Sequence, residues 1–322
     1  MITNQLKHLP TIQKVSISTS ARLHMGFFDL SGSSERMFGS VGLAIDAPCT
    51  QLEITKNESL LIESKSGQNV DKIVENLVKS LKIQNNFSLK VQQAIPEHVG
   101  LGSGTQMALA IGMGLNALFG LSFDVNHIAL EAKRGARSGI GIAAFLQGGF
   151  LVDTGKMNDT LPEIAFRQDF PSNWRVLLVQ DSAHVGVHGA TEAAAFTKLK
   201  PAQHHLRDLV LQHILPALQQ SNLLAFGALM ADLQAYNGDY FAPIQGGRFA
   251  SQDVAEVLRW LQQNGAACVG QSSWGPTGFA ILENQQQAEL LKTKAQLAFA
   301  GKSNIGFQCC RGKNTGASIQ LG

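Results

Sequence analysis

Apolar residues recur at intervals of three and four between residues 70 and 81, which is the spacing of one face of an α-helix. They are Val70, Ile73, Val74, Leu77, Val78 and Leu81. This stripe predicts an amphipathic helix that packs on a sheet. Alternating or β-branched residues at 15–20, 52–55 and 87–91 predict strands with one solvent-facing side, and these strands would supply that sheet.

The most apolar stretch of the chain runs from residue 107 to residue 121. It is shorter than the roughly 20 residues that a membrane-spanning helix needs, and Gly112, Gly114 and Asn116 interrupt it. We therefore expect a helix buried inside the protein and no membrane partner.

The second half of the chain mixes helical and extended patterns without strict alternation. Strands are predicted over 174–180, 268–271, 279–282 and 305–309, with several helices after the first of them and a helix over 285–298. This order is typical of an α+β fold rather than of a doubly wound parallel sheet.

Two further patterns concern a helix in the first half of the chain and the boundary between two domains. Asp124 is expected to cap a helix that reaches about residue 134, where Gly135 ends it. A chain of 322 residues is long enough for two domains. The loop 156–162 is the best candidate for their boundary, so we expect domains at 1–160 and 161–322.

Composition excludes several classes of protein. The 26 basic and 24 acidic residues nearly balance and form no basic run, so we expect no nucleic-acid partner. Four cysteines, Cys49, Cys268, Cys309 and Cys310, form no CxxC pair, which favours a reducing compartment. The first residues lack the pattern of a signal peptide. A cytoplasmic protein is therefore expected.

A glycine-rich segment precedes the apolar helix and is the most informative stretch of the chain. Gly100, Gly102 and Gly104 would let a backbone approach an anion closely, and the N-terminus of the helix would stabilise its negative charge. Ser103 and Thr105 add hydroxyl donors, and either could also ligate a metal ion held by phosphates. The alternative is a glycine turn that serves only to pack the helix.

The segment matches neither of the two commonest phosphate loops. No GxxxxGK[ST] string occurs, and a GxGxxG string would need glycine where Thr105 stands. The predicted phosphate-binding residues are Gly100, Leu101, Gly102, Ser103, Gly104, Thr105 and Gln106.

Several spaced motifs together resemble one known family. They lie at residues 21–29, 38–46, 96–106, 134–141, 148–153, 245–248 and 270–277. In this order they resemble the beta-ribofuranosylaminobenzene 5'-phosphate synthases, a family of the GHMP kinase superfamily. The resemblance implies a two-domain fold, with an N-terminal domain like ribosomal protein S5 domain 2 and a ferredoxin-like C-terminal domain.

One departure from the kinases of that superfamily bears on the reaction. Many of those kinases carry a catalytic aspartate where this chain, in the segment 138–142, places Ile142. An isoleucine side chain cannot accept a proton from a substrate hydroxyl. The resemblance therefore favours the synthase reaction, which joins phosphoribosyl pyrophosphate to para-aminobenzoate and releases CO₂ and pyrophosphate in tetrahydromethanopterin biosynthesis. An ATP-dependent small-molecule kinase or a non-catalytic phosphate-binding protein is the alternative.

The resemblance also implies the remaining site residues, a Mg²⁺ cofactor and a homodimer. Arginines in the matching motifs suit phosphate or carboxylate, because a guanidinium binds an oxyanion with two hydrogen bonds. The candidate catalytic residues are Arg22, His24, Asp29, Arg137 and Ser138. The candidate substrate-binding residues are Arg248, Gln271, Ser272, Ser273 and Trp274, the last as a flat surface for an aromatic ring. The candidate metal ligands are Ser103 and Asp46.

Overall fold

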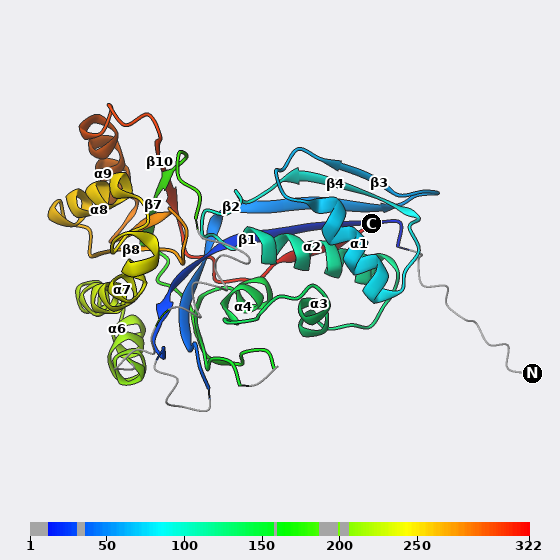
Figure 1. Ribbon diagram of the computed structural model, residues 1–322, viewed down its shortest axis with the longest axis horizontal. Helices are drawn as coiled ribbons and strands as arrows, with labels where there is room; N and C mark the ends of the chain where they lie inside the picture. Colours follow the sequence, from blue (N-terminus) through cyan, green and yellow to red (C-terminus); the bar gives the residue numbers. More distant parts are fainter. Residues whose placement is uncertain (1–11, 31–35, 158–159, 187–198, 200–205) are drawn as a thin grey trace, which may run out of the picture.

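The protein is described by a computed structural model that covers residues 12–30, 36–157, 160–186, 199 and 206–322 (Figure 1). Two β-sheets organise these residues, each with helices packed against it (Figure 1). The predicted α+β class is confirmed.

A seven-stranded sheet forms the larger part. Its strands are β1 (Lys14–Phe27), β2 (Ser40–Lys56), β3 (Leu61–Ser64), β4 (Phe87–Gln93), β5 (Phe150–Asp153), β6 (Ile164–Gln168) and β11 (Ser318–Leu321). The order is β11-β1-β2-β4-β3, while β5 pairs with β2 and β6 pairs with β5. The antiparallel pair of β1 and β2 is the longest ladder, and the half of it that pairs with β5 bends toward the second sheet (Figure 1).

Four helices accompany this sheet: α1 (Val70–Leu81), α2 (Ser103–Leu118), α3 (Val125–Glu131) and α4 (Ile140–Leu146). Helix α1 has the predicted bounds and buries Val70, Val74, Leu77 and Leu81. Helix α2 is buried on nearly all sides, which explains its almost uniformly apolar sequence. Helix α3 begins after the predicted cap Asp124 but ends at Glu131, three residues short of the expected end.

A four-stranded antiparallel sheet forms the second part. Its strands are β7 (Arg175–Asp181), β8 (Cys268–Gln271), β9 (Gly278–Leu282) and β10 (Ile305–Cys310). Their order β10-β7-β9-β8 is the ferredoxin-like order that the resemblance implied. The helical segments are a π-helix at Leu209–Ile214, α6 (Leu215–Gln219), α7 (Leu223–Gln245), α8 (Gln252–Gln263) and α9 (Gln285–Ala298).

The two sheets divide the chain differently from the expected domains. Strand β6, after the expected boundary at residues 160 and 161, still pairs with β5 of the first sheet. The chain enters the second sheet only between Gln168 and Arg175, and its last strand, β11, returns to pair with β1. The expected boundary therefore falls between two paired strands of the first sheet.

One apolar core joins the two parts. Leu23 and Leu43 of the β1–β2 ladder belong to the same cluster as Val176 of β7, Phe226 of α7 and Phe279 of β9. A second cluster lies between the other half of the ladder and helices α1, α2 and α3. The long ladder therefore supports both halves of the molecule.

A buried carboxylate fixes the turn before α4. Asp153, at the end of β5, is fully buried and accepts five hydrogen bonds. The donors are the backbone N–H groups of Ser40, Gly139 and Gly155 and the hydroxyls of Ser40 and Ser138. Burial raises the pKa of Asp153, and these hydrogen bonds oppose that shift.

We predict that Asp153→Asn lowers the free energy of unfolding by about 2 to 4 kcal/mol, because an amide nitrogen would face buried donors that it cannot satisfy. Chemical denaturation measures this change. Asp71→Asn, at an exposed position in the first turn of α1, is the matched control and should cost less than about 1 kcal/mol. Equal losses in the two variants would contradict the role given to Asp153.

Candidate active site

The glycine-rich segment forms the turn that starts α2. Gly100 and Gly102 have φ angles of +86° and +81°, in the left-handed region that favours glycine. Gly102 is the N-terminal cap of α2, and its carbonyl accepts hydrogen bonds from the N–H groups of Thr105 and Gln106. The N–H groups of Ser103 and Gly104 precede the first helical hydrogen bonds, so they can bind an anion at this end of the helix.

The turn is held against a segment from the second sheet. Ser272 Oγ donates to the carbonyl of Gly100 at 2.7 Å and accepts from the N–H of His24 at 3.0 Å. The N–H of Ser273 then donates to the carbonyl of His24 at 3.1 Å. Ser272 thereby connects β1, the glycine turn and the segment after β8.

A cavity of about 570 Å³ opens between these segments. All three glycines and both hydroxyl residues of the predicted loop line it. Its wall also includes Arg22, Lys72, His98 and Arg134. Among the described residues that line it, Glu97 alone is acidic. The cavity is therefore suited to a multiply charged anion.

A smaller pocket of about 30 Å³ adjoins the cavity, since Ser273 and Trp274 line both. Aromatic rings surround it: the centroid of Phe241 lies 4.4 Å from that of Trp274, and Phe27 lies 4.5 Å from His24. Its polar wall comprises Gln234, Asn237, Gln245, Arg248, Gln271 and Ser273. Four of the five predicted substrate-binding residues thus line one pocket.

His24 is neutral in this setting. Burial, and then the nearby positive charges of Arg22 and Arg137, lower its pKa to about 3. Its Nε2 atom is buried and has no hydrogen-bond partner among the described residues. His24 can therefore offer a hydrogen bond at this nitrogen without adding charge.

Two predicted loop residues face the interior instead. Leu101 is buried in the core shared by the two sheets. Gln106 is fully buried, accepts a hydrogen bond from Thr19 Oγ1 and donates to the carbonyl of Gly141 at 2.7 Å. These two residues hold the loop in place, while the glycines, Ser103 and Thr105 form the face that lines the cavity.

Three predicted catalytic residues line neither cavity. Asp29 is buried and forms an ion pair with Arg207 at 2.9 Å. Ser138 belongs to the Asp153 network. Arg137 acts on the site through its charge, which lowers the pKa of His24. Arg22 and His24 are the predicted catalytic residues that the fold brings to the cavities.

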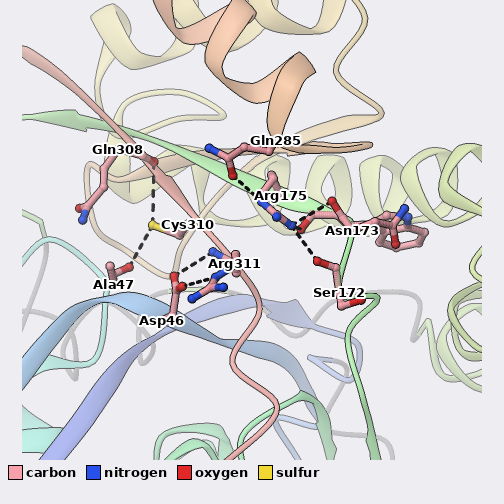
Figure 2. A network of polar contacts seen from close by, with 10 residues as sticks. Asp46, Ala47, Ser172, Asn173, Arg175, Gln285, Gln308, Cys310 and Arg311 are labelled. Atoms are coloured by element: carbon pink, nitrogen blue, oxygen red, sulfur yellow. Dashed lines mark hydrogen bonds and ion pairs between the residues drawn. The ribbon is translucent and has the colours of Figure 1, made fainter.

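Asp46, a predicted metal ligand, has a different position. Its carboxylate accepts from the backbone N–H and the Nε of Arg311, both at 2.8 Å, at the point where the chain leaves β10 (Figure 2). Next to this pair, Cys310 Sγ donates to the carbonyl of Ala47 at 3.1 Å (Figure 2). Asp46 thus joins the two sheets and lies outside the cavity that Ser103 lines.

The described residues contain no group of three or more His, Cys, Asp or Glu side chains that could hold a metal ion. Ser103, Thr105, Ser273 and Glu97 are the oxygen donors that the cavity offers from its hydroxyl and acidic side chains. Such a set fits Mg²⁺ only when substrate phosphates supply most of the ligands.

Two kinds of residue were absent from the predicted site. Both Arg134 and Lys72 line the cavity; Arg134 opens the motif at 134–141 but was not assigned to the site, and Lys72 is an isolated cation in the helical pattern at 70–81. Gln234 and Asn237 of α7 bind the backbone of β1 at Met25 and Phe27. Only the fold brings these residues to the site.

Comparisons of the chain with known protein families and solved structures agree with the geometry of the site. The model of the GHMP kinases N terminal domain matches residues 68–149, and that of the GHMP kinases C terminal domain matches residues 214–301. The L. major mevalonate kinase in complex with R-mevalonate has the same fold, with a TM-score of 0.68 and 15% identity over 93% of this chain and 97% of that chain. The fold and the glycine loop therefore define a GHMP-type enzyme.

Relatives within that superfamily are more specific. A beta-ribofuranosylphenol 5'-phosphate synthase of Methanocaldococcus jannaschii is 32% identical over 300 residues, which cover 82% of this chain and 88% of the relative. One of Archaeoglobus fulgidus is 28% identical over 331 residues, which cover 95% and 99%. The chain belongs to the family of beta-ribofuranosylphenol 5'-phosphate synthases, and the resemblance stated from its motifs is confirmed. No helix in the described part of the chain is long and apolar enough to cross a membrane.

We predict that Gly102→Val raises the dissociation constant for phosphoribosyl pyrophosphate at least about tenfold, or roughly 1.4 kcal/mol. A Cβ atom at this position would lie 3.2 Å from three atoms of the Arg22 side chain, so Arg22 must move. The positive φ adds strain of about 1 to 2 kcal/mol. Calorimetry measures binding, and thermal unfolding measures the strain.

Gly120→Val is the matched control, because Gly120 also has a positive φ, of +65°, but has no neighbouring atom within 4 Å of its Cβ position. Both variants should lose similar stability, and only Gly102→Val should lose affinity. Unchanged binding in Gly102→Val would show that the glycine turn serves only for packing.

Proposed function

We propose that the enzyme transfers the ribosyl 5-phosphate group of phosphoribosyl pyrophosphate to para-aminobenzoate, with release of pyrophosphate and CO₂. The observation that carries this proposal is the pairing of the two cavities. A cationic cavity at a helix N-terminus adjoins an aromatic-lined pocket, and Ser273 and Trp274 line both. A multiply charged donor and a flat aromatic acceptor could therefore meet at this border.

The chemistry of the donor explains the need for cations. When the bond from C1 of the ribose to pyrophosphate breaks, its electron pair leaves with the pyrophosphate and positive charge develops on the sugar carbon. Donors placed around the leaving group stabilise that charge separation. Arg22, the N–H groups of Ser103 and Gly104, and the positive end of α2 are the groups for this task.

The chemistry of the acceptor explains why no aspartate is needed at position 142. The para amino group donates electron density to the ring carbon that bears the carboxylate, and that carbon attacks C1. Loss of CO₂ returns the electron pair of the broken C–C bond to the ring and restores aromaticity. Ile142 is buried in the apolar core beside α2, so this position offers no base.

The specificity of the enzyme for its acceptor concerns the para substituent, which is either an amino or a hydroxyl group. The motif resemblance implied an aminobenzene product, whereas the relatives are named for a phenol product. An amino and a hydroxyl group both donate electrons to the ring, so both substituents suit the same reaction. We propose Trp274 as the surface on which the ring stacks, because it lies at the border of the two cavities.

We propose that Mg²⁺ enters as a complex with the donor. The charge of a departing pyrophosphate needs neutralisation, and the cavity provides few acidic ligands of its own. The Mg²⁺ would then be part of the substrate, and Ser103 is the predicted metal ligand that lines the cavity.

The proposal predicts CO₂ release that depends on three components. Enzyme incubated with carboxyl-labelled para-aminobenzoate, phosphoribosyl pyrophosphate and Mg²⁺ should release labelled CO₂, and exhaustive chelation should stop the reaction. Labelled para-hydroxybenzoate, assayed in parallel, shows which acceptor has the higher kcat/KM. No CO₂ from either acceptor, together with ATP turnover in the presence of small alcohols, would instead indicate a kinase.

We also propose that the enzyme is cytoplasmic. We further propose that it is a homodimer, because closed twofold assemblies are the commonest among homo-oligomers. Light scattering at working concentration should then give twice the mass of the chain. A mass equal to that of one chain would contradict the dimer.

A further inference from the structure

Three cationic side chains, Arg22, Lys72 and Arg134, line the wall of the larger cavity. They differ in the groups with which they form hydrogen bonds or ion pairs. Arg22 donates from Nη1 to the carbonyl of Gly100 at 2.6 Å. Lys72 forms an ion pair with Glu75 at 2.9 Å. Among the described residues, Arg134 has no acidic partner within ion-pair distance, and its buried Nε has no hydrogen-bond partner.

The backbone places Arg134 beside the turn. Helix α3 ends at Glu131, and the chain then bends through two residues of positive φ, Lys133 at +54° and Gly135 at +82°. The N–H of Arg134 donates to the carbonyl of Ala129 at 2.7 Å, which fixes the bend against the helix. The side chain of Arg134 therefore extends from a defined backbone position.

Its guanidinium lies beside the first turn of α2. A Cβ atom at Gly104 would be 3.4 Å from Nη1, 3.5 Å from Nη2 and 3.6 Å from Cζ of Arg134. Those three near-equal distances mean that the plane of the guanidinium covers the position where a side chain at residue 104 would begin. At these distances such a Cβ atom would be in ordinary van der Waals contact with the guanidinium, so Arg134 packs directly on the first turn of α2.

This arrangement is unfavourable without a ligand. Burial lowers the pKa of Arg134, and no acidic partner opposes that shift. Arginine nevertheless stays charged, so the protein holds a largely desolvated positive charge without a counter-charge, which costs free energy. An anion in the cavity would supply the counter-charge and up to two hydrogen bonds in the plane of the guanidinium.

We propose that Arg134 is a phosphate-binding residue of the site and that it binds the pyrophosphate group on the side of α2 opposite to Arg22. The two arginines flank the turn, since Arg22 packs over Gly102 and Arg134 over Gly104. The identity of the ligand as a pyrophosphate group rests on the proposed function. The anion site itself rests on the geometry.

The test uses inorganic pyrophosphate as the probe and calorimetry as the readout. Arg134→Gln should raise the dissociation constant for pyrophosphate at least about tenfold, or roughly 1.4 kcal/mol. Arg134→Lys keeps the charge but loses the planar pair of donors, so it should recover only part of the affinity. Lys133→Gln is the matched control: it removes the same charge from the adjacent, exposed residue and should bind within about twofold of wild type.

Thermal unfolding without ligand separates a binding role from a structural one. If Arg134 serves binding, Arg134→Gln removes an uncompensated charge and should melt at or above the wild-type temperature. A lower melting temperature together with unchanged pyrophosphate affinity would show that Arg134 only supports the fold. A loss of affinity of equal size in Lys133→Gln would also overturn the proposal, because general charge would then explain it.

The calorimetric test of Arg134 is independent of the assay of CO₂ release. Wild-type enzyme that releases no CO₂ would refute the proposed function, while a loss of pyrophosphate affinity in Arg134→Gln would still support the anion site. CO₂ release with unchanged pyrophosphate affinity in Arg134→Gln would refute only the role of Arg134.

Discussion

The close approach of two backbone segments determines the site. A Cβ atom at Gly100 would collide with the carbonyl oxygen of Ser272, and a Cβ atom at Gly275 would collide with the carbonyl oxygen of Val99. Only glycine at both positions lets the start of α2 contact the segment after β8. Because these segments belong to different sheets, this contact places the anion-binding end of α2 at the border between the two halves of the molecule.

Two buried amide side chains of α7, Gln234 and Asn237, hold the strands β1 and β8 from which this contact is built. Gln234 of α7 donates to the carbonyl of Met25 in β1 at 2.6 Å and accepts from the N–H of Gln271 in β8 at 2.8 Å. Asn237 makes a similar reciprocal pair with the backbone of Phe27. These buried amides give β1 and β8 fixed positions, and the two cavities follow from that geometry.

Local patterns in the sequence predicted much of the fold and part of the site. The apolar periodicity at 70–81 and the helical pattern at 285–298 predicted α1 and α9 with their observed bounds, because such patterns are local properties of the chain. The first half of β2, from Ser40, is buried on both faces and shows no alternation, so it was not predicted. The glycine loop was found from its composition, whereas Arg134 was not, because its closeness to Gly104 arises only from the turn after α3.

The distribution of charged groups favours a reaction in which an anion departs over one in which a hydroxyl is deprotonated. Three carboxylates near the site have structural partners: Asp29 binds Arg207, Asp46 binds Arg311, and Asp153 binds the turn before α4. Their acceptor capacity is used by the fold, and Ile142 provides none. The cavity retains Arg22 and Arg134, and His24 at its edge is held neutral by burial and by neighbouring positive charge. Among the described residues that line the cavity, Glu97 is the single carboxylate beside the two arginines. This balance favours stabilisation of a leaving pyrophosphate over activation of an alcohol for attack on a phosphate.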